Sequence, residues 1–189
     1  MNRSVLAIAL LALSTSASAE GFDYNYLQLG YGVIDFDDIN ADGDGLGLSG
    51  SYAINPDWHV FASYQGANLD FGVDATSFGL GIGYNTELSP VVDMVARLSY
   101  EYADIDTPGP GSFDDNGFGL GIGLRFAASE ELEVEASIDY VDFGGGGDDT
   151  GFSLGALYNF SDSFALGLGG NWTDDAAAYT LSGRVYFDR

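Results

Sequence analysis

Charged side chains alternate with apolar residues in several stretches of this chain, and their spacing could build either an ion path or a set of ion pairs. Three arginines share this alternation with three acids. The predicted charge network consists of Arg97, Glu101, Arg125, Glu135, Asp139 and Arg184. One interpretation is a polar conduit or gate. The other is a structural plug, because charges that are buried must be paired.

A second candidate site is the segment Asp38-Ile39-Asn40-Ala41-Asp42-Gly43, which matches the first half of a calcium-binding loop. The predicted ligands are Asp38, Asn40, Asp42 and Asp44. The closing glutamate is missing, since Ser49 stands at its position, and no flanking helices are predicted. We therefore predict no cofactor beyond a weakly bound divalent cation. The alternative is a solvated acidic loop whose summed field attracts cations.

Composition argues against catalysis and against nucleic acid. His59 is the single histidine and follows the predicted tight turn at residues 55–57, and cysteine is absent. No base with partners in reach is evident, so we predict that the protein is not an enzyme. The formal charge is −24, with 29 acids and 5 arginines. A chain with this charge is not expected to bind nucleic acid through its phosphates.

The elements that position these charges are strands with two unlike faces. In residues 117–126, five large residues (two Phe, two Leu and one Ile) alternate with four glycines and Arg125. Alternate residues of a strand point to opposite faces. The same pattern predicts ten strands, with eight as the alternative count. They cover residues 24–34, 45–54, 58–65, 76–85, 91–103, 117–126, 132–141, 151–160, 164–173 and 178–187.

The glycine-rich face is poorly suited to be the outside of a soluble protein. A membrane barrel explains it, since the apolar face meets lipid and the other face meets a narrow lumen. All three arginines of the predicted strands lie on the inner face, and aromatic residues collect at both ends of the outer one. We predict an all-β, antiparallel, up-and-down transmembrane barrel. A soluble barrel with the apolar face inside is the alternative.

Short turns alternate with longer acidic loops, which are predicted at residues 35–44, 66–75, 104–116, 142–150 and 174–177. In bacterial barrels the short turns are periplasmic and the long loops extracellular. We therefore expect both termini on the periplasmic side.

The first residues have the features of a secretory signal peptide. Arg3 provides a positive charge, residues 5–13 form a short apolar run, and Ala17-Ser18-Ala19 is a cleavage motif. We predict a signal peptide at residues 1–19, cleavage between Ala19 and Glu20, and one barrel domain at residues 20–189. The expected address is the outer membrane of a Gram-negative bacterium, reached through the Sec pathway.

Several short motifs resemble one family. They are Ala19-Glu20-Gly21, Tyr24-Asn25-Tyr26, Ala41-Asp42-Gly43, Ser51-Tyr52-Ala53, His59-Val60-Phe61, Gly81-Ile82-Gly83-Tyr84-Asn85 and Ala96-Arg97. Up to about residue 100 the chain resembles small proteobacterial outer-membrane barrels once described as secreted activators of plant immunity and linked to diffusible-signal regulation. More loosely it is similar to OmpX- and OmpA-like barrels. The first resemblance implies an outer-membrane address, and neither resemblance implies a catalytic site.

The function predicted from the sequence is that of a structural or surface-interaction barrel with a polar, largely plugged lumen, because small barrels fill their interiors with side chains. One alternative is a narrow cation-preferring pore. Another is a surface adhesin or sensor that acts through its acidic loops. The expected partners are outer-membrane lipid, lipopolysaccharide and the outer-membrane assembly machinery, and the barrel is expected to be a monomer.

Overall fold

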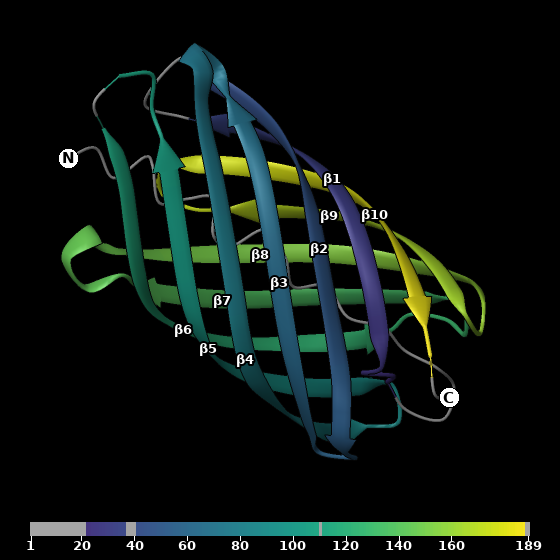
Figure 1. Ribbon diagram of the computed structural model, residues 1–189. Coiled ribbons are helices and arrows are strands. Elements are labelled where there is room, and N and C mark those ends of the chain that lie inside the picture. Colours follow the sequence, from purple (N-terminus) through teal and green to yellow (C-terminus); the bar gives the residue numbers. More distant parts are fainter. Residues whose placement is uncertain (1–21, 37–40, 110, 188–189) are drawn as a thin grey trace.

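The computed structural model describes residues 22–36, 41–109 and 111–187, which form a closed barrel of ten antiparallel strands (Figure 1). Each strand pairs with its neighbours in the chain, and β1 closes the barrel on β10. The predicted fold class and the count of ten, rather than eight, are confirmed. The strands are β1 (Tyr26–Phe36), β2 (Ala41–Asn55), β3 (Trp58–Leu69), β4 (Val73–Ser89), β5 (Val92–Asp106), β6 (Ser112–Ala127), β7 (Leu132–Asp142), β8 (Asp148–Ser161), β9 (Phe164–Trp172) and β10 (Ala176–Tyr186).

Within the part of the chain that the structure describes, the few helical residues lie at the tips of hairpins. They form two short 3-10 turns, η3 (Asp70–Gly72) between β3 and β4 and η4 (Gly144–Gly146) between β7 and β8. No helix in the described ranges has the length and apolar character needed to cross a membrane. The strands therefore account for the regular structure on which the site is built.

The two faces of each strand are as unlike as the sequence predicts. On β1, Leu27 and Leu29 are more than half exposed, whereas Gln28 between them is buried. The same alternation places Leu98 outside and Arg97 inside on β5. Large apolar side chains thus cover the outer surface, and polar or small residues line the lumen, as in a barrel surrounded by lipid.

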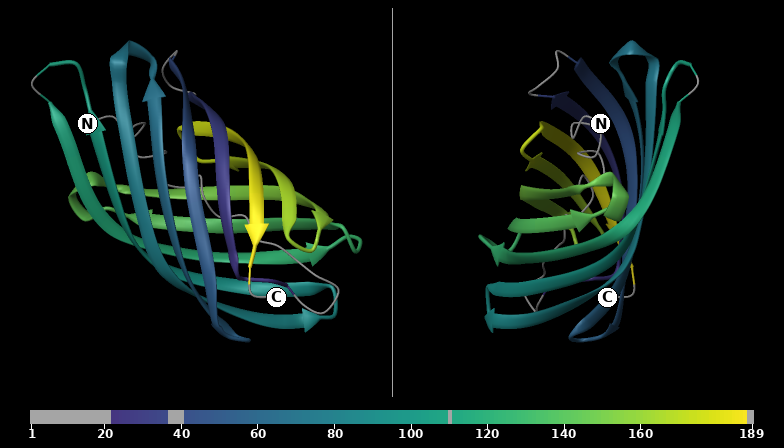
Figure 2. Two further views of the ribbon diagram at one scale, coloured as in Figure 1. Left: turned by 45° about the vertical axis from the view of Figure 1, so that its right-hand side comes forward. Right: turned by 90° about the vertical axis from the view of Figure 1, so that its left-hand side faces the viewer.

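Most of the strands are longer than predicted, so part of what was assigned to acidic loops is sheet. The predicted loop at 104–116 is mostly a hairpin, in which β5 runs to Asp106 and β6 begins at Ser112. Aspartate disfavours strands in general. Here the residues that alternate with the aspartates, such as Ile105 and Phe113, face inward opposite one another and stabilise the extension. The hairpins β3–β4 and β5–β6 rise prominently at the loop end of the barrel (Figure 2).

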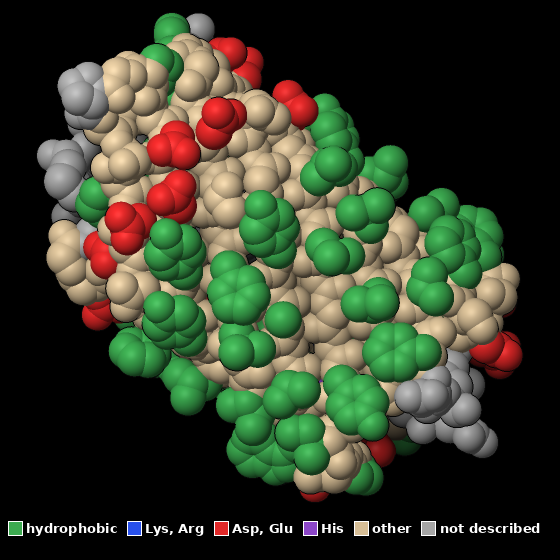
Figure 3. Space-filling model, viewed as in Figure 1, with side chains coloured by type: hydrophobic (Ala, Val, Ile, Leu, Met, Phe, Trp, Pro, Cys, Tyr) green, Lys and Arg blue, Asp and Glu red, His purple; other side chains and the backbone are tan. Residues whose placement is uncertain are grey.

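The side-chain pattern therefore inverts along most of the strands. In the middle of the barrel the outer face is apolar, but beyond its aromatic residues it becomes acidic, as the red groups at one end of Figure 3 show. We call these outward aspartates the acidic collar. It comprises Asp35, Asp42, Asp44, Asp74, Asp104, Asp106, Asp114, Asp142 and Asp148. On the inner face at this level apolar residues predominate, so here the sheet has water outside and an apolar core inside.

Candidate functional site

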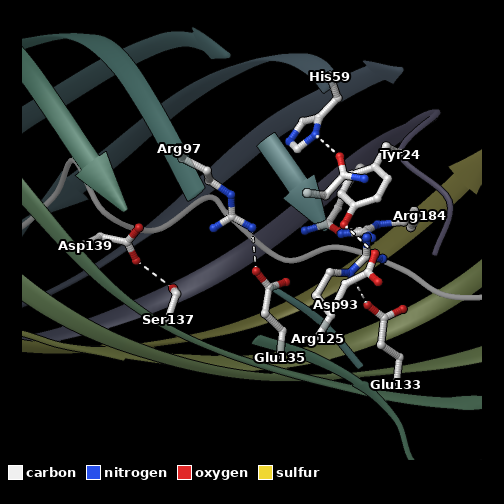
Figure 4. A network of polar contacts seen from close by, with 12 residues as sticks. Tyr24, His59, Asp93, Arg97, Arg125, Glu133, Glu135, Ser137, Asp139 and Arg184 are labelled. Carbon is white, nitrogen blue, oxygen red and sulfur yellow. Dashed lines mark hydrogen bonds and ion pairs between the residues drawn. The ribbon is translucent and has the colours of Figure 1, made fainter. Parts of the chain in front are cut away.

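Most of the candidate charge network lies in the half of the lumen nearer the short turns, whereas Glu101 lies nearer the loops. Figure 4 shows the other members of the network. Arg97, Arg125 and Arg184 project inward from β5, β6 and β10, with exposed fractions of 6%, 0% and 0%. On the lipid-facing surface, an arginine near the midplane of the membrane would cost about 2–4 kcal/mol. Inside the barrel, each guanidinium instead contacts polar or aromatic partners.

Two ion pairs join described residues in this part of the lumen. Arg97 Nη2 lies 2.5 Å from Glu135 Oε1, and Arg125 Nε lies 2.7 Å from Glu133 Oε1. The Arg97–Glu135 pair spans the width of β6, which lies between β5 and β7 and carries glycine at position 121, opposite Arg97. All four side chains are nearly inaccessible to solvent, so each charge depends on its partner.

The predicted network is divided into smaller sets. Arg184 donates from Nε and Nη2 to Gln28 Oε1, at 2.8 and 2.5 Å. Its guanidinium also lies 3.8 Å from the centre of the Tyr26 ring. Glu101 and Asp139 accept hydrogen bonds from Ser99 and Ser137. Among the described residues, neither carboxylate forms an ion pair with an arginine.

Sequence reasoning missed two of the partners in these contacts. Arg125 pairs with Glu133 and not with Glu135, although both glutamates face inward on β7. The register alone would favour Glu135, which lies opposite Arg125, but the Arg125 side chain reaches along the strand to Glu133. Gln28 was overlooked because it carries no charge, but its inward parity on β1 beside Arg184 is the signal that could have found it.

The residues before β1 form a second, unpredicted part of the site. Strand β1 begins at Tyr26, so the prediction of a strand from residue 24 is wrong. We call Phe22–Asn25 the N-terminal strap. The Tyr24 ring stacks on His59 with 4.5 Å between centroids, and its hydroxyl donates to Asp93 Oδ2 at 3.2 Å. Burial raises the pKa of the Tyr24 phenol, which lies outside the spanning strands.

The strap also covers an arginine. The Arg125 guanidinium carbon lies 4.6 Å from the centre of the Phe22 ring and 4.5 Å from that of Tyr24. Asn25 fixes the strap to the wall, since Ala53 N donates to its side-chain oxygen at 2.8 Å. The strap thus lies across the turn end of the lumen. His59 belongs to this packing and to a hydrogen bond with Asn85 Oδ1 at 3.2 Å.

Apolar side chains occupy the other end of the lumen. A buried cluster from β1, β3, β4, β5 and β10 consists of Ile34, Phe36, Ala67, Ala75, Ile105, Ala176 and Ala178, with Leu69 and Val73 packed against it. Beside it, Val141 and Phe143 pack with Ala103. We call these residues the apolar layer. A cavity of about 40 Å³ lies next to it, lined by residues such as Gln28, Ser49 and Gln65. A cavity of that volume holds a few water molecules at most.

The two proposed calcium ligands that the structure describes, Asp42 and Asp44, do not line the lumen. Asp42 and Asp44 are exposed on the outer face of β2, and the Asp42 backbone N–H donates to Asp70 Oδ2 at 3.2 Å. Asp38 and Asn40 lie outside the described residues, as do Ala19 and Glu20 of the predicted cleavage site. Within the described ranges, no group of three or more acidic or histidine side chains is arranged to hold a metal ion.

The collar contains an electrostatic arrangement that the sequence reasoning did not anticipate. Aspartates lie directly opposite one another across four strand pairs, at Asp35/Asp42, Asp74/Asp106, Asp104/Asp114 and Asp142/Asp148. Like charges directly opposite in a sheet are destabilising, by roughly 0.2–1 kcal/mol per pair. The outer surface of the extension therefore carries repulsion that the fold alone does not require.

Comparisons with known proteins agree with this geometry. A search of curated proteins gave no match. Among solved structures, the KdgM porin in complex with disordered oligogalacturonate is similar, with TM-score 0.54 and 8% identity over 86% of this chain and 99% of that one. The outer membrane protein OprG from Pseudomonas aeruginosa has TM-score 0.50 and 12% identity over 92% of this chain and 100% of that one. These likenesses show the fold.

The family is shown by the sequence match. Residues 5–160 match the family described as outer membrane protein beta-barrel domain. That stretch covers most of the chain and includes β1 to β7 and nearly all of β8. Together with the inward charges, the apolar outer band and the closed ten-stranded sheet, it supports an outer-membrane location. This chain belongs to the outer membrane protein beta-barrel domain family.

Proposed function

We propose that this protein is a surface-interaction barrel with a closed lumen, and that its acidic collar contacts cationic partners at the cell surface. The observation that carries this proposal is the set of four directly opposed aspartate pairs on the outer face. Their mutual repulsion costs stability, and features that violate a folding rule are expected at functional positions. A cationic partner would relieve the repulsion that the folded barrel leaves in place.

The filled lumen supports placing the function outside the barrel. A permeating solute would have to pass the ion pairs of Arg97 and Arg125 and then the apolar layer. The alternative of a cation-preferring pore draws on the acidic mouth, but the collar aspartates alternate with inward apolar residues such as Ile105. The field of the collar is therefore directed mainly at the surroundings of the barrel.

The remaining expectations from the sequence belong to the same proposal. The barrel has no catalytic role and reaches the outer membrane through the Sec pathway and the assembly machinery. It works as a monomer in contact with lipid and lipopolysaccharide. Within its broad family it belongs with the small barrels once described as secreted activators of plant immunity, on the motifs that include His59-Val60-Phe61.

A neutralisation experiment tests the collar. We expect the quadruple variant Asp74→Asn, Asp104→Asn, Asp106→Asn and Asp114→Asn, in lipid nanodiscs, to bind a polylysine peptide several-fold more weakly at low salt than the wild type. The difference should shrink as salt screens the charges. The same variant should unfold at higher urea concentration, because two repulsive pairs are removed. Binding is measured by isothermal titration calorimetry.

The matched control neutralises acids at the opposite end of the barrel. Glu130, Glu131 and Asp162 lie exposed at the short turns. Their replacement by Gln, Gln and Asn changes the net charge by three, against four in the collar variant. We expect this control to lose much less of its binding. Equal losses per charge at the two ends would contradict the proposal and leave only non-specific attraction to net charge.

A further inference from the structure

The turn end of the lumen has the features of a binding site for aromatic side chains. Its groups are the Arg125 guanidinium, the imidazole of His59 and the carboxylate of Asp93, which come from β6, β3 and β5. His59 stacks on the Tyr24 ring, and Asp93 accepts a hydrogen bond from the Tyr24 hydroxyl (Figure 4). Arg125 lies against the rings of both Phe22 and Tyr24. These contacts select an aromatic ring, and at one position a ring with a hydroxyl group.

Arg125 shows how much this site depends on its occupant. The residue has an exposed fraction of 0%, and its Nη1 and Nη2 atoms have no hydrogen-bond partner among the described residues. The guanidinium is therefore held by Glu133 through Nε and by the two rings of the strap. Cation–π contacts are strongest when they are desolvated, as here. Without the strap this charged group would face the opening of the lumen.

The strap is also separable from the barrel. The ladders of β1 begin at Tyr26, which pairs with Tyr186 on one side and Ser51 on the other. Phe22–Asn25 lies outside these ladders and is held by side-chain contacts and by Asn25, whose carbonyl accepts a hydrogen bond from Phe187 N at 3.2 Å. The segment could leave without breaking a strand pair, with Asn25 as its point of attachment.

We propose that the turn end of the lumen is a binding site for a short aromatic chain segment, occupied by the protein's own N-terminal strap, and that the strap can be displaced. Its release opens the charged half of the lumen to the periplasmic side. The apolar layer keeps the other end closed, so release exposes a pocket and not a pore. This inference goes beyond the surface role of the collar, since it concerns the opposite end of the barrel.

Because the chain contains no cysteine, one introduced thiol reports on access to this pocket. Val95 is 1% exposed and is the next inward residue after Asp93 on β5. In the Val95→Cys protein in detergent micelles, a small charged maleimide should react slowly. Adding Phe22→Ala and Tyr24→Ala should speed the reaction by about tenfold or more, the change expected when desolvated cation–π contacts are lost. Tyr24→Phe keeps the ring and should react nearly as slowly as the parent.

Binding of an added peptide distinguishes a true binding site from a general loosening of the barrel. A peptide with the sequence Phe-Asp-Tyr-Asn, added to the Phe22→Ala/Tyr24→Ala protein, should slow labelling again, and Ala-Asp-Ala-Asn should not. Equal labelling with and without the strap rings, or no protection by the aromatic peptide, overturns the inference. The mobility of the unheated protein on a gel verifies folding. If the double variant does not fold, Tyr24→Ala alone takes its place, with the same outcomes in labelling and protection.

Discussion

Replacing Glu133 by alanine should lower the free energy of unfolding by about 3–5 kcal/mol, which is the cost of removing one member of a buried ion pair. The residue is 1% exposed, and its Oε1 atom is the carboxylate oxygen that Arg125 Nε contacts at 2.7 Å. The variant leaves Arg125 charged, buried and without its acid, while the strap remains intact. Urea unfolding in micelles, followed by the fluorescence of Trp58 and Trp172, measures the change.

The control and the rescue make this prediction specific. Glu130 lies exposed in the adjacent turn, and Glu130→Ala should change stability by less than about 0.5 kcal/mol. The double variant Glu133→Leu with Arg125→Met removes both charges and should recover most of the loss, since apolar replacements of a buried pair are often neutral. If the double variant is as unstable as Glu133→Ala, the loss comes from packing and not from an unpaired charge.

Adding one methyl group to Gly81 should destabilise the barrel by roughly 1–3 kcal/mol through overpacking. Gly81 faces the lumen from β4, opposite Phe61 on β3 and Ser99 on β5. A Cβ at this position would lie 2.5 Å from the carbonyl oxygen of Leu98 and 2.8 Å from Cε1 of Phe61. The carbonyl belongs to the sheet and cannot move away easily. Urea unfolding of Gly81→Ala measures the cost.

The same glycine-to-alanine substitution at another position in the lumen should not destabilise the barrel. At Gly169 on β9, the nearest atom to an added Cβ is the carbonyl oxygen of Leu154, at 3.7 Å, which is ordinary contact. Gly169→Ala should be neutral or stabilise slightly, because alanine loses less backbone entropy than glycine on folding. Equal stability of Gly81→Ala and Gly169→Ala would contradict the close packing of the lumen beside β4.

The sequence was sufficient to predict which face of each strand points outward, but not where the strands end. Period-two alternation fixed which side of β5 carries Arg97 and which carries Leu98, because one face meets lipid. The boundary at Asp106 was missed because aspartate is a poor strand residue considered by itself. Its place in a strand depends on Ile105 packing inward against residues from β1, β3, β4 and β10. Contacts between distant segments of this kind are not visible in local composition.

The strap was missed for a related reason. Tyr24 continues the alternation of Tyr26 and Gln28, so the sequence assigned it to a strand. Tyr24 lies outside the sheet because the pairing of β1 with β2 and β10 begins only at Tyr26. The choice of Glu133 as the partner of Arg125 likewise depends on side-chain direction within a register, which a list of inward residues leaves open.

We predict that the lumen is closed by the ion pairs in its charged half and by the apolar layer at its other end. Single-channel recording of the folded protein in a planar bilayer, across a salt gradient, tests this most directly. We expect an electrically silent barrel, and the Phe22→Ala/Tyr24→Ala protein should stay silent because the apolar layer remains. Steady openings of the wild-type protein with a cation-selective reversal potential would contradict the account and make the acidic mouth part of a conducting pore.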